Sequence, residues 1–353
     1  MPGDLPEDTA PIRPEERFDE ERVAAYLRAN VPQLAAAATI EFAQFPGGKA
    51  NLTYLVRADG VEYVLRRPPL GPVAPGSHDM AREYRVLSVL WQAYRRAPRA
   101  YHLCTDEEVM GKPFFVMERR RGWVIREEWP PGFPEDPARR RDLALDLVAA
   151  LAELHTVDEV ALGLERLGRP DGFVARQVEG WTGRWNLAKI DDLPAMDHLA
   201  SALARSIPDP QAATLLHNDF KLDNTMVGRD AEVVAVFDWD MATRGDPLVD
   251  LGTALAYWAK PDDPTYPIAG ERAVTLAPYL GRDEVAEHYA ERTRFDLAAL
   301  DFYVALAYFR IAVIIQQIFV RYHRGQTSDE RFAGLDRLVP LLAEAGAEAA
   351  AGL

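Results

Sequence analysis

The spacing of apolar residues changes about a third of the way along the chain. Residues 39–45 and 53–57 are short β-prone runs that flank a polar turn, and residues 113–118 form another apolar run. Short runs of this kind next to turn residues predict β-strands. Residues 136–157 instead place apolar side chains at helical spacing, which predicts a long core helix. The first part is therefore expected to contain a sheet, and the second to be mostly helical.

Further helices are expected on both sides of this change. In the first part they cover residues 19–29 and 77–94, the second of which begins with a Ser-x-Asp cap signal. In the second part, a helical insertion is expected at residues 168–209 and helices at 283–291, 297–324 and 328–349. The pattern predicts an α+β chain in two parts: a sheet-containing part in residues 1–118, and a larger, mostly helical part in residues 119–353.

The most apolar stretch is residues 302–320. Arg310, Gln316 and Gln317 interrupt it. A membrane span needs about 20 predominantly apolar residues. We therefore expect a buried helix of the second part here, and no membrane partner.

Two polar segments of the second part carry the candidate chemistry. Residues 216–224 read LHNDFKLDN and residues 236–240 read VFDWD, so that Asp238 follows Asp219 by nineteen positions. Phosphoryl transfer needs an aligned acceptor and positive charge on the phosphate oxygens. One carboxylate to orient the acceptor, with Asn224 and Asp238 as oxygen ligands for Mg²⁺, supplies both. Asp and Asn also populate ordinary turns, but the whole set of residues favours a kinase.

The local pattern supports this interpretation. Residues 225–227 and 233–237 are apolar, β-prone runs around a glycine-containing turn, and they predict a hairpin. One predicted ligand precedes the first strand and the other follows its partner strand. Folding of the hairpin is therefore expected to bring the two ligands together.

These residues resemble the aminoglycoside phosphotransferase and choline-kinase-like superfamily, whose fold is that of eukaryotic protein kinases. The resemblance implies two lobes, a small antiparallel-sheet N-lobe and a larger, mostly helical C-lobe. The resemblance implies that Asp219 is the catalytic base and that His217 supports its loop. It also implies that Asn224 and Asp238 hold Mg²⁺, and the predicted metal set includes Asp240 as well.

Two neighbours of Asp219 belong to the same comparison. Asn218 stands where this superfamily often has glycine, and asparagine is among the few residues that tolerate a positive φ. Lys221 matches a lysine of the protein-kinase catalytic loop and would neutralise the transferring phosphate. The alternative for Lys221 is an ordinary solvent-facing lysine.

The turn between the first two strands is a candidate phosphate-binding loop. Paired glycines let backbone N–H groups approach phosphate oxygens closely, although a plain hairpin turn is the alternative. It is not a Walker A loop, because Ala43 replaces the first glycine and Ala50 follows the lysine in place of Ser or Thr. The candidate residues are Gly47, Gly48, Lys49 and Asn51.

The remaining nucleotide-binding candidates follow from the resemblance. Arg66 stands where most kinases have a strand lysine that contacts phosphates, and Arg67 could share that role. Glu83 matches the helix glutamate that pairs with the strand cation, with a solvated helix charge as the alternative. Backbone groups of the strand that leads into the hinge are expected to bind adenine, at Val116, Met117 and Glu118.

Three other residues with reactive side chains are interpreted as structural. Cys104 has no surrounding motif and is expected to be a buried thiol. His155 ends the long helix and is expected to pack or cap. Asp250 is expected to support the catalytic loop.

Composition narrows the class of protein. The chain has 353 residues, of which 40 are basic and 55 acidic, giving a formal net charge of −15. Nucleic-acid binding favours a basic face, so nucleic acid is not the expected partner. One cysteine excludes an intramolecular disulfide and is typical of the cytoplasm. The acidic, proline-containing N-terminus is unlike a signal peptide.

Flanking segments narrow the resemblance further. Residues 176–181, 190–197 and 308–312 are similar to the phosphotransferase domain of acyl-CoA dehydrogenase family members 10 and 11 and of freestanding bacterial relatives. Because the chain ends at Leu353, we expect no flavin-dependent dehydrogenase domain to follow. The resemblance implies an acceptor hydroxyl on a hydroxyacyl chain, as an acid or a CoA thioester.

Three clusters of arginines would suit such an anionic acceptor. They contain Arg95, Arg96 and Arg99, then residues 119–121, then residues 139–141. We hypothesise an anion-binding rim, with ordinary exposed arginines as the alternative.

The sequence thus predicts a small-molecule hydroxyl kinase that uses ATP or GTP with Mg²⁺. An antibiotic kinase acting on an aminoglycoside or macrolide, and a non-catalytic nucleotide-binding regulator, are the alternatives. A protein kinase is not expected, because Asp240 is followed almost directly by Asp246-Pro247, with no long activation segment between them. The acceptor, the choice between ATP and GTP, and the oligomeric state are left open.

Overall fold

The chain divides into two compact units that are interleaved in sequence. The computed structural model describes residues 8–46, 51–71, 79–263, 265, 274–327 and 329–353. The first unit contains Met1–Trp123, Thr225–Gly228 and Val233–Ala242, and the second contains Val124–Asn224, Arg229–Glu232 and Thr243–Leu353. The sequence placed everything after residue 118 in the second lobe. The segments Thr225–Gly228 and Val233–Ala242 instead belong to the first unit.

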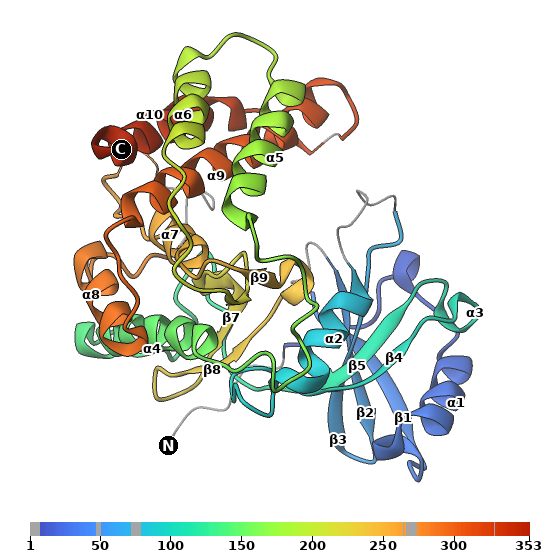
Figure 1. The fold of residues 1–353 in the computed structure, drawn as a ribbon. Helices are drawn as coiled ribbons and strands as arrows, with labels where there is room; N and C mark the ends of the chain where they lie inside the picture. Colours follow the sequence, from blue (N-terminus) through green and yellow to red (C-terminus); the bar gives the residue numbers. More distant parts are fainter. Residues whose placement is uncertain (1–7, 47–50, 72–78, 264, 266–273, 328) are drawn as a thin grey trace. The chain divides into compact units, whose positions relative to one another are not determined.

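The first unit is built on a five-stranded antiparallel sheet in the order β1-β2-β3-β5-β4 (Figure 1). Its strands are β1 (Ile40–Gln44), β2 (Leu52–Ala58), β3 (Val61–Arg67), β4 (Ala100–Cys104) and β5 (Phe114–Glu118). The strands expected around the first turn and before the hinge are confirmed. The sequence analysis missed β4, which lies at the edge of the sheet and pairs with one neighbour, β5.

Helices cover both faces of this sheet. On one face, Tyr54 and Val56 of β2 join a buried apolar cluster with Leu27 of α1. Leu55 and Val64 are also buried and belong to the alternate set of strand positions, so the opposite face is covered as well. The helices of this unit are α1 (Glu20–Asn30), α2 (Met80–Leu90) and α3 (Glu107–Met110). Asp79 caps α2 by accepting a hydrogen bond from the Arg82 backbone N–H at 3.0 Å.

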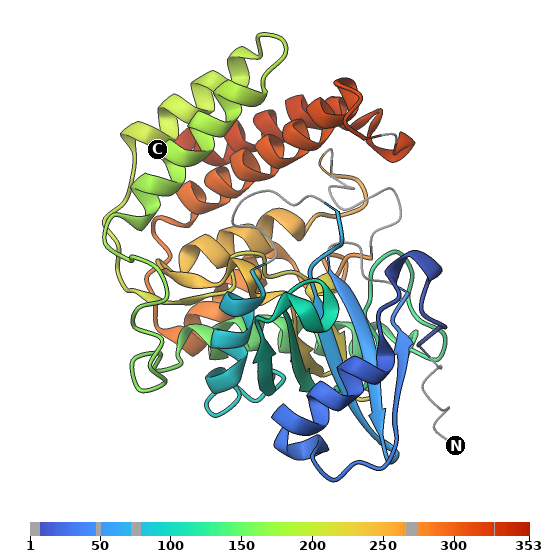
Figure 2. The same ribbon diagram turned by 90° about the vertical axis from the view of Figure 1, so that its right-hand side faces the viewer.

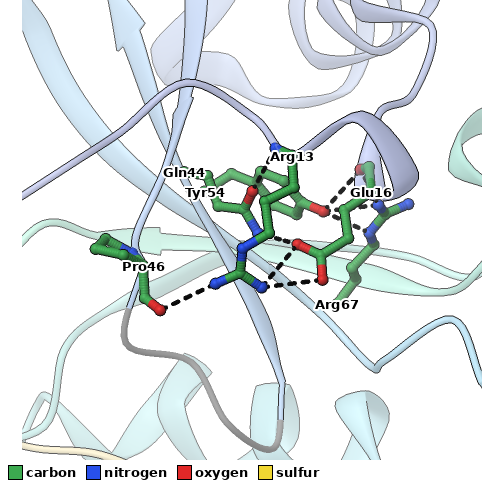
Figure 3. Close-up of polar contacts among 6 residues, drawn as sticks. All are labelled: Arg13, Glu16, Gln44, Pro46, Tyr54 and Arg67. Carbon is green, nitrogen blue, oxygen red and sulfur yellow. Dashed lines mark hydrogen bonds and ion pairs between the residues drawn. The ribbon is translucent and has the colours of Figure 1, made fainter.

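Arg67 at the end of β3 is buried and bonded to the protein interior (Figure 3). Its guanidinium donates to the carbonyl oxygens of Glu16 at 2.6 Å and Met110 at 3.1 Å, and to the Tyr54 hydroxyl. The ring of Phe18 lies 5.5 Å from it. A buried guanidinium with this many acceptors fastens the N-terminal segment to the sheet, which is a structural role.

The same N-terminal segment also reaches the end of β1. Ala10 forms an isolated bridge with Gln44, and the Arg13 backbone N–H donates to the Gln44 side chain at 2.9 Å. Figure 3 shows the Arg13 guanidinium between Glu16 and the carbonyl oxygen of Pro46, to which it donates at 3.0 Å. The segment therefore fixes the backbone just before the predicted phosphate-binding turn.

The expected hairpin is present, and its register is defined. It consists of β7 (Thr225–Val227) and β8 (Val233–Val236). Thr225 pairs with Val236, so the paired ends of the hairpin lie next in sequence to Asn224 and close to Asp238. Arg96 donates to the carbonyl oxygen of Val233 at 2.8 Å, and its own carbonyl accepts from the Val236 N–H.

The second unit is mostly helical, as predicted. Its elements are α4 (Pro137–His155), α5 (Phe173–Ala188), α6 (Pro194–Arg205), β6 (Thr214–Leu216), β9 (Thr243–Gly245), α7 (Leu248–Tyr257), α8 (Arg282–Thr293), α9 (Leu300–His323) and α10 (Leu338–Ala349). Helix α9 contacts α5, α6, α7 and α10. In both views α5 and α6 lie beside α9 and α10 (Figures 1 and 2).

One predicted helix begins later than expected. The helix expected from residue 328 begins at Leu338, after two short 3₁₀ turns. Proline has no N–H and fits an α-helix only in its first turn. Pro340 therefore lies in the first turn, and the α-helix begins at Leu338.

Helix α9 contains the most apolar stretch of the chain. By length and composition it could cross a membrane, but 72% of its most apolar window is buried inside the protein. That burial is typical of a core helix, as expected from the polar residues that interrupt it.

We predict that Arg67→Lys destabilises the protein by about 2–3 kcal/mol, because lysine cannot reach the same set of acceptors and leaves buried carbonyls unpaired. Urea unfolding would measure the change. The matched control is Arg57→Lys on β2, which forms an exposed ion pair with Glu62 at 3.2 Å and should cost less than about 0.5 kcal/mol. Equal effects of the two variants would contradict the structural role of Arg67.

Candidate active site

The candidate catalytic loop begins where β6 ends. Leu216 is the last residue of β6 and pairs with Thr243 of β9, and the loop closes with a 3₁₀ turn, Leu222–Asn224. Asn218 within the loop has a φ of 70°, in the left-handed region. The conformation that the sequence analysis considered for Asn218 is therefore present, and asparagine accommodates it.

Asp219 lies between two polar side chains of its own loop. Its carboxylate is 3.1 Å from Nζ of Lys221 and accepts a hydrogen bond from the Asn224 amide at 2.9 Å. The same amide donates to the Asp219 carbonyl, and the Asp219 N–H donates to Nδ1 of His217 at 3.3 Å. About a quarter of the Asp219 side chain is exposed, at 27%. The loop therefore presents a fixed carboxylate that a substrate hydroxyl can reach.

Lys221 is partly buried beside this carboxylate. Its ammonium lies 4.9 Å from the ring centre of Tyr257 on α7. Burial alone would lower the pKa of Lys221, but the Tyr257 phenol and the Asp219 carboxylate hold that pKa above its ordinary value. Lys221 is therefore a fixed cation beside the Asp219 carboxylate, and the solvent-facing alternative does not describe it.

Asp250 of α7 fixes the backbone of the loop. Its two carboxylate oxygens accept hydrogen bonds from the backbone N–H groups of His217 and Asn218, each at 2.7 Å. Burial would raise the pKa of Asp250, but the hydrogen bond and charge of His155 keep that pKa below its ordinary value. The carboxylate thus stays ionised and holds two donors at the start of the loop.

His155 has a more specific place than the sequence indicated. It is buried at the end of α4, with Nε2 at 3.3 Å from the Asp250 carboxylate and Nδ1 at 2.6 Å from the Tyr289 hydroxyl of α8. It therefore packs, as expected, and also orients Asp250. Spacing along the sequence gave no sign of this contact, because the two residues are 95 positions apart.

The first unit contains other predicted site residues, among them Arg66, Glu83 and Asp238. Nε of Arg66 lies 3.1 Å from the Glu83 carboxylate, and its Nη2 lies 2.5 Å from that of Asp238. The ion pair between strand cation and helix glutamate that the resemblance implies is therefore present. Burial raises the pKa of Glu83 to about 7, and the neighbouring guanidinium opposes that rise.

The alternating faces of β3 distinguish Arg66 from Arg67 as the candidate for phosphate contact. Successive side chains of a β-strand point to opposite faces. Arg67 is held by the N-terminal segment, whereas Arg66 faces Glu83 and Asp238. Of the two, Arg66 is the candidate for phosphate contact.

The predicted metal ligands offer suitable donor atoms. Asn224 supplies an amide oxygen, and Asp238 and Asp240 supply carboxylates. Mg²⁺ is commonly held by one or two carboxylates together with substrate phosphates, without a dedicated protein cage. Among the described residues there is no group of three or more His, Cys, Asp or Glu side chains that could hold a metal ion. The donor chemistry therefore fits Mg²⁺ delivered with a nucleotide.

Asp238 and Asp240 sit in an unusual local backbone. Asp238 has a φ of 68°, in the left-handed region, and precedes the 3₁₀ turn Trp239–Met241. Burial would lower the pKa of Arg66, but the charge of Glu83, and after it those of Asp238 and Asp240, hold that pKa above its ordinary value.

The other nucleotide-binding candidates are placed only in part. Gly47, Gly48 and Lys49 lie outside the described residues, and Asn51 is buried directly before β2. Val116 and Met117 have partners in both β3 and β4, which leaves little of their backbone for adenine.

Glu118, the last of the predicted hinge residues, is also engaged. Its backbone N–H donates to the Arg99 carbonyl at 2.8 Å, and its carboxylate lies 3.0 Å from Arg120. The expected adenine contact at residues 116–118 is therefore not supported by the pairing of β5.

The three arginine clusters have local partners. Arg96 bonds the β8 backbone, and Arg99 lies over the ring of Trp91 at 4.4 Å. Arg119 and Arg121 pair with acidic residues, and Arg140 and Arg141 contact Tyr279. These contacts favour structural roles over an anion-binding rim.

An apolar hollow lies against the catalytic loop within the second unit. Its lining includes Leu151, Phe220, Lys221, Leu251, Tyr257 and Leu276. The sequence analysis did not identify these pocket residues, because apolar helix positions look alike in sequence whether they line a pocket or fill a core.

Comparisons with known proteins agree with this geometry. The model of the phosphotransferase enzyme family matches residues 41–303. The chain is 32% identical over 356 residues to acyl-CoA dehydrogenase family member 11 of Rattus norvegicus, covering 98% of the chain and 45% of that protein. Family member 10 of Mus musculus is 31% identical over 342 residues, covering 95% and 31%. The chain thus spans less than half the length of these relatives.

Solved structures show the same fold. A crystal structure of a protein from Ralstonia eutropha, provisionally assigned as an aminoglycoside phosphotransferase, matches with a TM-score of 0.81 and 30% identity, covering 95% of this chain and 99% of that one. The GDP complex of aminoglycoside 2'-phosphotransferase-IIIa matches with a TM-score of 0.59 and 15% identity over 94% and 99%, which shows the fold alone. The expected protein-kinase-like fold is confirmed.

We predict that Asp250→Asn lowers stability by about 2–4 kcal/mol at pH 7, because one end of an amide cannot accept from a backbone N–H and the buried charge is lost. Since the pKa of Asp250 is depressed, its contribution is present above the ordinary value of 3.8 and disappears as the pH falls through the depressed pKa.

Denaturant unfolding between pH 3 and pH 7 would measure this difference between wild type and variant. Asp209→Asn, at an exposed loop aspartate, is the matched control and should leave stability unchanged. A difference between wild type and Asp250→Asn that grows below pH 3.8 would contradict the assignment.

Proposed function

Because the chain belongs to the phosphotransferase enzyme family, we propose that it is a nucleotide- and Mg²⁺-dependent kinase of a small-molecule hydroxyl group. The proposed nucleotide is ATP, with GTP as the alternative. We place the enzyme in the cytoplasm, without nucleic acid or membrane as a partner.

The observation that carries this proposal is the environment of Asp219. Its carboxylate is oriented by the Asn224 amide and neutralised by the Lys221 ammonium. A carboxylate held in this way can orient an acceptor hydroxyl and take its proton as the phosphoryl group is transferred. The cation beside it would balance charge on the phosphate oxygens.

The proposed roles of the other residues follow from their chemistry. Arg66 would contact the nucleotide phosphates, and Glu83 would keep its guanidinium oriented. Asn224, Asp238 and Asp240 would hold Mg²⁺, which supplies positive charge to the phosphate oxygens when it is bound with the nucleotide. These assignments rest on residue type and family membership.

For the acceptor, we propose a hydroxy acid or a hydroxyacyl-CoA. The curated relatives are acyl-CoA dehydrogenase family members, and an aliphatic chain suits the apolar hollow beside the catalytic loop. A polycationic aminoglycoside would favour acidic groups, and none is among the described residues that line this hollow. The antibiotic-kinase alternative is therefore the less favoured acceptor class.

A non-catalytic regulator is the remaining alternative. Degenerate kinases usually lose the base or a metal ligand. Asp219, Asn224 and Asp238 are all present in this chain. Their presence favours catalysis.

We predict that Asp219→Asn lowers phosphoryl transfer at least about 100-fold while the protein stays folded, because asparagine cannot take the acceptor proton. An ADP-release assay with Mg²⁺-ATP would measure turnover on hydroxy acids, hydroxyacyl-CoA thioesters, aminoglycosides, macrolides and amino alcohols. Thermal melting would check the fold. Retained transfer by this variant would remove Asp219 from the role of base.

We predict that Arg66→Met raises the KM for the nucleotide about 10- to 100-fold, since a charge-assisted contact to phosphate is lost. Steady-state kinetics with varied ATP would measure the change. The matched variant Arg67→Lys, at the next position of β3, should lower stability while leaving the nucleotide KM of the folded protein unchanged. The reverse pattern would assign the phosphate contact to Arg67.

A further inference from the structure

Arg310 is a buried cation in the middle of the apolar helix α9. Its side chain is almost inaccessible, with 4% of the residue exposed. The guanidinium donates through Nη1 to the side-chain oxygen of Asn218 at 3.0 Å and through Nη2 to the backbone carbonyl of Asn218 at 2.8 Å. It also lies 5.4 Å from the ring centre of Trp181 on α5. Arg310 therefore donates two hydrogen bonds to one residue of the candidate catalytic loop.

Burial makes this arrangement costly unless the cation is well placed. Burial lowers the pKa of Arg310, and the charges of Asp219 and Asp250 oppose that change. A buried charge that loses its partners is strongly destabilising. Without the contact to Asn218, a neutral apolar residue at this position of α9 would give a more stable protein. The contact therefore accounts for an arginine here.

The contact acts on the peptide unit that carries Asp219. A peptide group is planar, so the Asn218 carbonyl and the Asp219 N–H move together. Arg310 bonds the carbonyl end at 2.8 Å, and His217 accepts from the N–H end at 3.3 Å. With both ends held, the plane of this peptide unit and the position of the Asp219 Cα atom are fixed.

The preceding peptide unit is held from a different helix. The Asn218 N–H donates to the Asp250 carboxylate of α7 at 2.7 Å. Asn218 thus connects α7 and α9 while its φ of 70° turns the chain toward Asp219. Glycine would permit the same backbone but would lack the side-chain oxygen that accepts from Arg310. The asparagine is therefore matched to this arginine.

We propose that Arg310 is a positioning residue for phosphoryl transfer, which acts by fixing the Asn218–Asp219 peptide unit so that the Asp219 carboxylate meets the acceptor hydroxyl. This inference rests on the proposed function of Asp219 as the base. Loss of Arg310 should lower kcat and leave the nucleotide KM almost unchanged, because misplacement of a catalytic group by about 1 Å costs about 100-fold in rate.

The experiment compares Arg310→Met and Arg310→Lys with a matched control on the same helix. The control is Gln316→Met, which removes a buried side chain that donates to the Ala188 carbonyl at 3.2 Å, away from the loop. We expect a fall in kcat of about 100-fold for Arg310→Met and less than about 3-fold for Gln316→Met, with the nucleotide KM within about 3-fold of wild type in both. Equal kcat losses in the two variants would overturn the proposal.

Arg310→Lys keeps the buried charge but removes the two-pronged contact. Lysine cannot reproduce a planar, bidentate donor, so we expect kcat to fall at least about 10-fold here too. If Arg310→Met does not fold, this variant still decides the question. Full activity of a folded Arg310→Lys protein would show that the bidentate contact does not position the base.

A double-mutant cycle tests the matched pair directly. Asn218→Gly alone should reduce kcat moderately, but added to Arg310→Met it should change kcat by less than about 2-fold, since the partner is already gone. Additive losses would mean that the two residues act independently, against the proposal.

Hydrogen exchange separates this inference from the proposed function. Arg310→Met should speed exchange of a peptide spanning residues 214–222 at least about 10-fold, and Gln316→Met should not. If wild type transfers phosphate and Arg310→Met retains kcat and loop protection, the positioning role fails while the proposed function stands. If wild type transfers phosphate to no acceptor, the proposed function fails, and unchanged loop exchange in Arg310→Met would still overturn the positioning role.

Discussion

The arrangement of the catalytic loop depends on one buried carboxylate. Asp250 accepts the backbone N–H groups of His217 and Asn218, and His155 approaches the same carboxylate from α4. Two charge-assisted hydrogen bonds in a desolvated place are strong and directional. They fix the point at which the chain leaves β6. The conformation of the loop that carries Asp219 is therefore determined by the helices that surround it.

Buried charges have the same function in both units. In the first, Arg66 is held between Glu83 and Asp238, and in the second, Arg310 is held against the backbone of the loop. A buried charge without partners would destabilise the fold. The neighbouring groups are therefore held in the arrangement that pairs with it. This is how a fold with a largely apolar core can hold polar groups in a defined geometry.

The sequence predicted those parts of the site that lie in one short segment. Asp219, Lys221 and Asn224 are close in sequence, and the structure places the side chains of Lys221 and Asn224 within hydrogen-bonding distance of the Asp219 carboxylate. The hairpin after Asn224 was also predictable, because two β-prone runs flank a turn. Contacts between distant segments were not. His155 and Asp250, or Arg310 and Asn218, are about 95 and 92 positions apart, and no local pattern records which helices will be neighbours.

The sequence by itself therefore determined the fold class, the candidate catalytic motif and the chemistry of its side chains, because these depend on residue type and on short-range spacing. Only the tertiary structure decided that Arg66 faces the acidic residues while Arg67 is bonded to the N-terminal segment, a choice made by the alternating faces of β3. It also decided that β5 is paired on both sides at Val116 and Met117, and that apolar residues of α4 and α7 line a hollow while similar residues elsewhere are packed. Such outcomes depend on which surfaces meet, and packing against a distant segment leaves no period in the sequence.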